Sequence, residues 1–152
     1  MNDGVVESTM ALPQNFNRDH TFFGVHVPFL AWLEVRDVRL QPGEAQLELK
    51  LRPELLNSLD AAHGGVVCTV LDVAMAAAAR SDDPSVRVVT VEMSVKFLQP
   101  GTDTLLATGR TLHATRSLTF CEAEIRDHEG KLVAKATGVF KRLKPGRGNG
   151  DG

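Results

Sequence analysis

Residues 63–72 read His-Gly-Gly-Val-Val-Cys-Thr-Val-Leu-Asp and open the only long apolar helix that the sequence predicts. Two glycines stand at the predicted helix start, and Asp72 is the only charged residue between positions 64 and 79. An ionisable group on so apolar a helix is costly to bury unless it has partners or a chemical role. The uncapped N–H groups of a glycine-lined helix start are donors for an oxygen that carries negative charge. This combination favours acyl chemistry.

Composition narrows the class of protein. The chain has 152 residues, 43% of them hydrophobic and 24% charged, which is typical of one globular domain with a sizeable core. A net charge of −2 argues against general binding of nucleic acid. The apolar run 66–79 is too short to span a bilayer comfortably, so we expect no membrane segment. Cys68 and Cys121 form no close-spaced motif, which fits a reducing, cytoplasmic location.

Three segments are expected along the chain. Residues 1–15 are polar and irregular and predict a flexible N-terminus. Residues 144–152 are Gly-rich and predict a disordered tail. No repeat or linker divides the rest, so residues 16–143 are expected to form a single domain.

Alternation of apolar and polar residues predicts strands on both sides of the helix. Residues 45–52 alternate, and a turn at 41–44 joins them to an earlier strand at 35–40. A short helix is expected at 22–32, with Pro28 near its start. Further strands are expected after the long helix at 63–80, in the segments 89–97, 104–115, 121–126 and 131–143. The short turns imply antiparallel pairing, and a helix that is apolar nearly all round must be wrapped by its sheet. The predicted class is α+β, with a curled antiparallel sheet around one long central helix.

A spaced set of residues resembles the hotdog-fold thioesterases. The set consists of Asn57, the His63-Gly64-Gly65 triplet, Asp72 on the helix and Thr90 at the opening of the next strand. Within this family, the set resembles the branch of phenylacetate-degradation and Arthrobacter-type 4-hydroxybenzoyl-CoA thioesterases. The resemblance covers about residues 29–143 and includes the last hairpin and strand. It implies hydrolysis of an acyl- or aryl-CoA to the free acid and CoA.

Thioester hydrolysis needs a donor for the oxygen that gains charge, and a base or nucleophile. The backbone N–H of Gly64, or of Gly65, can serve as the donor, and Asp72 is the candidate base or nucleophile. Eight residues of helix separate Gly64 from Asp72 by about 12 Å, so one thioester cannot reach both on one helix. A working site therefore requires Asp72 from a second subunit, which a two-fold dimer supplies twice.

The resemblance also assigns roles to the remaining residues. It implies that Asn57 and Thr90 position the water or the acid, and that His63 orients the thioester. It implies that Gly65 contacts the substrate. It also implies that Arg116, Ser117 and Lys144 contact the CoA moiety. It implies a homodimer or a homotetramer built as a dimer of dimers. No metal or redox cofactor is expected, since CoA is part of the substrate and the histidines and cysteines lack metal-ligand spacing.

Several alternatives stay open at this point. Taken alone, Asp72 fits a structural acid at a subunit seam equally well, although the glycine helix start and the other matched residues favour catalysis. His63 taken alone fits an ordinary residue of a helix start. Alternation puts Thr90 on the polar face of its strand with Glu92, so it reaches the site only at a seam or where the strand twists. Cys68 is interpreted as a small hydrophobic residue rather than a nucleophile.

The runner-up function is a non-catalytic hotdog module that binds acyl-CoA. A hotdog hydratase is a further alternative, but the acid–histidine spacing it would need is not found. Aryl and medium-chain acyl groups both remain possible substrates.

Overall fold

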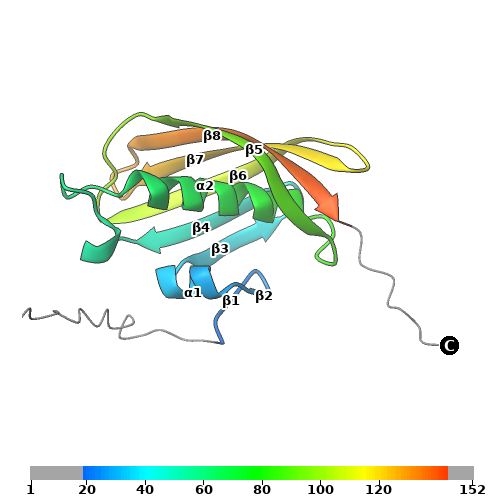
Figure 1. The fold of residues 1–152 in the computed structure, drawn as a ribbon, viewed down its shortest axis with the longest axis horizontal. Helices are drawn as coiled ribbons and strands as arrows, with labels where there is room; N and C mark the ends of the chain where they lie inside the picture. The colour runs from blue at the N-terminus through cyan, green and yellow to red at the C-terminus, as the bar shows by residue number, and fades with distance from the viewer. Residues whose placement is uncertain (1–18, 144–152) are drawn as a thin grey trace, which may run out of the picture.

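One helix, α2 (Gly64–Ala79), lies across one face of a six-stranded antiparallel sheet (Figure 1). The structure is a computed structural model and describes residues 19–143. The order across the sheet is β3-β4-β6-β7-β8-β5. These strands are β3 (Arg36–Gln41), β4 (Glu44–Lys50), β5 (Arg87–Phe97), β6 (Thr104–Ala114), β7 (Leu118–Asp127) and β8 (Leu132–Leu143). The predicted α+β class and its antiparallel pairing are confirmed.

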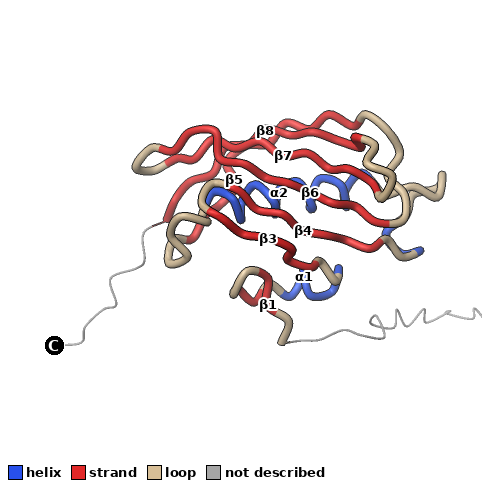
Figure 2. Tube along the Cα trace, turned by 180° about the vertical axis from the view of Figure 1, so that it is seen from behind, coloured by secondary structure: helices blue, strands red, loops and turns tan. Residues whose placement is uncertain are grey.

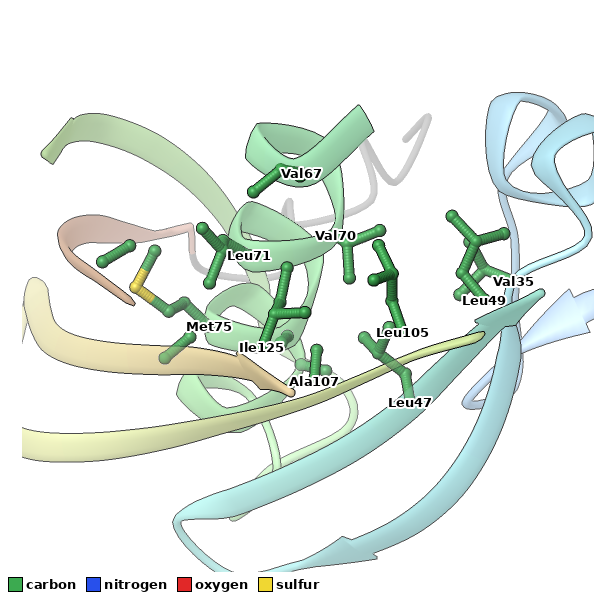
Figure 3. Close-up of a cluster of buried hydrophobic side chains, with 14 of the residues drawn as sticks. Val35, Leu47, Leu49, Val67, Val70, Leu71, Met75, Leu105, Ala107 and Ile125 are labelled. Atoms are coloured by element: carbon green, nitrogen blue, oxygen red, sulfur yellow. The ribbon is translucent and has the colours of Figure 1, made fainter. Parts of the chain in front are cut away.

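The sheet curls around the helix, so that α2 contacts all six strands (Figure 2). Val70, Leu71 and Met75 of the helix are fully buried. They meet inward-facing strand residues such as Leu105 and Ile125, which are equally buried (Figure 3). Burial of this apolar surface is the main favourable contribution to folding. The helix has no strong amphipathic pattern, because its half-buried face also carries apolar residues such as Val66 and Val73.

The closest approach of sheet to helix is at Gly109 in β6. A β-carbon at this position would overlap the carbonyl of Ala74 and lie 2.8 Å from the backbone nitrogen of Met75. Only glycine therefore fits between the two backbones. This contact sets the distance of the helix from the centre of the sheet.

The N-terminal part of the described chain differs from the sequence prediction. Instead of one helix over 22–32, β1 (Thr21–Phe22) and β2 (Val25–His26) form a small hairpin, and α1 (Pro28–Leu33) follows it. Phe23 and Gly24 at the hairpin turn have positive φ values of 45° and 76°, which a right-handed helix excludes. Pro28 opens α1 as expected. A short 3₁₀ helix, η1 (Pro53–Leu55), lies between β4 and α2.

The two terminal segments predicted from the sequence are not among the described residues. The flexible N-terminus predicted for 1–15, the tail predicted for 144–152 and the candidate Lys144 all lie outside the described residues. None of the helices within residues 19–143 combines the length and the hydropathy that crossing a bilayer requires.

Replacing Gly109 with alanine is expected to destabilise the fold by about 3 kcal/mol, because the new methyl group meets helix backbone that cannot move aside. Gly138→Ala in β8 is the matched control. Its β-carbon would come within 3.1 Å of the flexible Met75 side chain and of the Phe140 ring. Urea unfolding should show a much smaller loss for Gly138→Ala. Equal losses would contradict the proposed backbone contact.

Candidate active site

The start of α2 leaves one backbone donor uncapped. His63 is the N-cap residue, and its Nδ1 accepts a hydrogen bond of 2.9 Å from the N–H of Gly65. The carbonyl of His63 accepts the N–H groups of Val66 and Val67. Within residues 19–143, the N–H of Gly64 has no acceptor. Of the two glycines, Gly64 is therefore the one whose N–H can donate a hydrogen bond to a substrate oxygen.

Asp72 is held by a hydroxyl group from the neighbouring strand. Thr90 in β5 donates a hydrogen bond of 2.7 Å to Oδ1 of Asp72. No hydrogen bond to Oδ2 is found within the described part of the chain. The carboxylate thus has one oxygen oriented by the protein and one that can accept a proton from elsewhere.

A β-bulge in β5 brings Thr90 to the helix side. The pairing of β5 with β8 shifts between Thr90 and Glu92, so the alternation of faces reverses at Val91. Val89 and Val91 are accordingly exposed, at 46% and 59%, whereas Met93 beyond the bulge packs against the core. Uninterrupted alternation placed Thr90 on the polar face, and that prediction is wrong on this side of the bulge.

Asn57 lies in the loop that leads into α2. Its Oδ1 accepts the backbone N–H groups of Leu59 and Ala61, at 2.9 and 3.2 Å. No hydrogen bond joins Asn57 to Asp72 or Thr90 within residues 19–143. In a single subunit, the side-chain oxygen of Asn57 therefore orders the loop before the helix.

Arg116 and Ser117 occupy the exposed turn between β6 and β7. The turn is closed by the Thr115 hydroxyl, which accepts the N–H of Leu118 at 3.0 Å. Neither residue lines the cavities beside α2 described below. Within one subunit, the structure does not bring this turn to the helix start or to Asp72.

Two cavities open along the exposed face of α2. One, of about 370 Å³, is lined by His63, Gly65 and Thr69 together with residues of α1 and η1. The other, of about 630 Å³, contains Asp72 and again Thr69 in its wall. Phe29 of α1 also lines both. His63 and Gly65 therefore face one hollow and Asp72 an adjacent one of the same subunit, whereas Gly64 lines neither.

Sequence reasoning missed the N-terminal wall of the larger cavity. The wall comes from the hairpin and α1, and includes Phe22, Phe23 and Phe29. Three phenylalanines within eight residues were the available signal, since Phe is otherwise sparse in this chain. Arg80 and Arg87, which also line this cavity, carry no local pattern that marks them.

The cysteines and the possible metal ligands of the described chain offer little further chemistry. Burial raises the pKa of the Cys121 thiol to about 11, so it stays protonated at neutral pH and is a poor nucleophile. Cys68 on α2 is half-buried and makes no disulfide. No cluster of three or more His, Cys, Asp or Glu side chains that could hold a metal is found in residues 19–143.

The antiparallel sheet curled around one long helix is the hotdog fold, an α+β architecture. The helix start carries the uncapped Gly64 amide, and the lone carboxylate of Asp72 follows about two turns later. The model of the Thioesterase superfamily matches residues 59–134. The chain belongs to the Thioesterase superfamily. Both the helix start and Asp72 fall within the matched region.

Individual relatives agree with this membership. The conserved protein PA5202 from Pseudomonas aeruginosa is similar in structure, with a TM-score of 0.73 and 30% identity over 77% of this chain and 94% of that one. The PaaI protein of the Escherichia coli phenylacetic acid degradation operon has a TM-score of 0.71 and 26% identity over 76% and 83%. In sequence, the acyl-coenzyme A thioesterase PaaI of E. coli is 28% identical over 108 residues, or 70% of this chain and 76% of PaaI. Human acyl-coenzyme A thioesterase 13 is 25% identical over 101 residues, or 64% of this chain and 72% of its own length.

Replacing His63 separates helix capping from any role at the substrate. His63→Ala removes the acceptor for the Gly65 N–H and is expected to cost about 1 kcal/mol of stability. Asparagine is a good N-cap residue, so His63→Asn should recover most of that loss in urea unfolding. If the imidazole also orients a thioester, the stable asparagine variant will remain slow in thiol release. A fully active His63→Asn protein would limit His63 to capping.

Proposed function

We propose that this protein is an acyl-CoA thioesterase that hydrolyses an acyl or aryl thioester to the free acid and CoA without a metal or redox cofactor. The observation that carries the proposal is the lone carboxylate of Asp72, hydrogen-bonded by Thr90 in the wall of a largely apolar cavity. Membership of the Thioesterase superfamily and similarity to acyl-coenzyme A thioesterases support it. The similarity to PaaI favours the phenylacetate-degradation branch.

The proposed oxyanion donor is the N–H of Gly64. A thioester carbonyl gains negative charge as its carbon is attacked, and a fixed donor at a helix N-terminus stabilises that charge. The N–H of Gly65 is already bonded to His63. It therefore contributes to this site through the absence of a side chain, which leaves room for the substrate.

The proposed base or nucleophile is Asp72 of the partner subunit. The two groups stand about 12 Å apart along one helix, so one carbonyl cannot touch both. Two antiparallel α2 helices related by a two-fold axis bring each Gly64 opposite the other subunit's Asp72. The hydroxyl of Thr90 occupies Oδ1 and leaves Oδ2 to take a proton from water or to attack the carbonyl.

The remaining candidates complete this proposal. His63 would orient the thioester. Asn57 would position the attacking water, or the carboxylate of Asp72, in the site shared between the two subunits. Arg116 and Ser117 are exposed and can contact the phosphates of CoA from a neighbouring subunit, together with Lys144. A dimer, or a dimer of dimers, is the assembly proposed.

A non-catalytic acyl-CoA-binding module remains the second candidate. It is favoured by the hydrogen bond from Thr90 to Oδ1 of Asp72, which also fits a structural role for this carboxylate. Release of free thiol from a panel of acyl-CoAs distinguishes the two functions. Binding without release for every member of the panel would leave only the module.

Two substitutions at Gly64 test the donor. The position is the first residue of α2, where proline is well tolerated, and His63 before it has the extended conformation that proline requires, with φ −59° and ψ 138°. Gly64→Pro deletes the N–H and should lower kcat by about 100-fold or more. Gly64→Ala keeps the N–H, and its methyl group would meet only the Phe97 ring at 3.6 Å. The alanine variant should stay active. Equal activity of the two folded proteins would exclude this amide.

Asp72→Asn should keep the fold and lower kcat by about 100-fold or more, because the amide cannot accept the proton. Mixing subunits then tests the shared site. A dimer of one Asp72→Asn and one Gly64→Pro subunit retains one site with both groups intact. After unfolding and refolding as an equal mixture, the two inactive proteins should recover about a quarter of wild-type turnover. No recovery would place both groups in one subunit's site.

A further inference from the structure

The larger cavity beside α2 has apolar walls. It measures about 630 Å³ and lies between the helix and the N-terminal hairpin with α1. Its aromatic and aliphatic lining includes Phe22, Phe23, Val27, Phe29, Leu30 and Leu40. Such walls suit a hydrocarbon chain and would leave the polar groups of a nucleotide without hydrogen-bond partners.

Three charged residues line this cavity: Asp72, Arg80 and Arg87. Arg80 is the C-cap residue that follows α2, and Arg87 is the first residue of β5. Eight residues of helix place Arg80 about 12 Å from Asp72 along the axis. The cavity therefore has a carboxylate at Asp72, one guanidinium group about two turns farther along the helix at Arg80, and a second at the start of β5.

Neither arginine has an anionic partner within residues 19–143. Arg80 donates to the carbonyl oxygen of Pro84 at 2.8 Å, and Arg87 makes no ion pair. The acids on the turn between them are engaged elsewhere. Asp82 pairs with Arg142 at 3.3 Å, and Asp83 accepts hydrogen bonds from Ser85. Two guanidinium groups that line an apolar cavity and have no anionic partner in the described chain are suited to bind an anion.

We propose that the cavity holds the acyl group of the substrate and that this group carries a carboxylate at its far end. The inference rests on the proposed thioesterase function, because Asp72 then marks where the thioester carbon lies. The hydrocarbon chain of the acyl group packs against the apolar walls, and its terminal carboxylate pairs with Arg80 and Arg87. The length of helix between Asp72 and Arg80 favours a medium-length dicarboxylic acyl chain over a short one.

The test compares octanoyl and suberyl thioesters, which have the same number of carbons and differ in the terminal carboxylate. Each acyl group is presented both on CoA and on N-acetylcysteamine, which lacks the phosphates of CoA. Wild-type protein should show a lower KM for the suberyl member of both pairs. Arg87→Met should raise the suberyl KM by about tenfold and leave the octanoyl KM unchanged on either thiol.

Arg80→Met should act in the same direction, and Arg126→Met on the outer sheet is the matched control. Arg126 pairs with Glu124 far along β7 and lines neither cavity. A KM that rises equally for both acyl groups, and only on CoA, would show that the arginines bind phosphate and would overturn the proposal. Equal wild-type KM values for octanoyl and suberyl thioesters would overturn it as well.

A binding measurement separates this inference from the proposed function. Calorimetric titration of the Asp72→Asn protein with octanoyl-CoA and suberyl-CoA does not depend on turnover. Tighter suberyl binding that Arg87→Met abolishes supports the carboxylate site, even if no thioester is hydrolysed. If the wild-type protein hydrolyses octanoyl-CoA but Asp72→Asn binds octanoyl-CoA and suberyl-CoA equally well, the proposed function stands and the carboxylate site is excluded.

Discussion

The backbone of β6 rests directly on the backbone of α2, because Gly109 presents no side chain to Ala74. This contact fixes the depth at which the helix lies in the curled sheet. Once the helix is fixed, its inward face is buried and the stripe that carries Thr69 and Asp72 is left half-buried. The same depth brings Asp72 within hydrogen-bond reach of Thr90 on β5. The packing of the core and the geometry of the site therefore have a common origin.

The order of the elements follows from local patterns in the sequence, and the site follows only in part. Residues 45–51 alternate and lie in β4, and the glycine pair at 64 and 65 opens α2 as expected. Thr90 could not be placed, because Thr90 and Val91 both favour strands and nothing local marks a bulge between them. The bulge depends on pairing with β8, where the partner of Thr90 is Phe140, 50 residues farther along the chain. The hairpin at 21–26 was missed because its turn needs two residues with positive φ, and Phe23 gives no sign of that.

The two glycine amides at the start of α2 have different roles: the Gly65 N–H caps the helix, and the Gly64 N–H is free, within the described chain, to bind a substrate oxygen. The N–H of Gly65 bonds to the side chain of His63, so part of the first turn is satisfied within the subunit. The N–H of Gly64 has no such partner in the described chain, so it can donate to water or to a ligand oxygen. The capping bond at Gly65 fixes the first turn, and so holds the Gly64 amide in a defined direction for that oxygen.

A straight α-helix also constrains how a donor and a carboxylate on it can cooperate. Residues eight apart lie on similar faces but about 12 Å from one another, which no rotamer of aspartate spans. A second helix must therefore supply the missing group. Symmetry then sets its direction, because reciprocal pairing of Gly64 with Asp72 requires that the two helices run antiparallel. In that arrangement the partner's helix start lies beside Asp72, which also lines the cavity that reaches Arg80. The proposed dimer thus depends on the spacing from Gly64 to Asp72, and the proposed substrate on the equal spacing from Asp72 to Arg80.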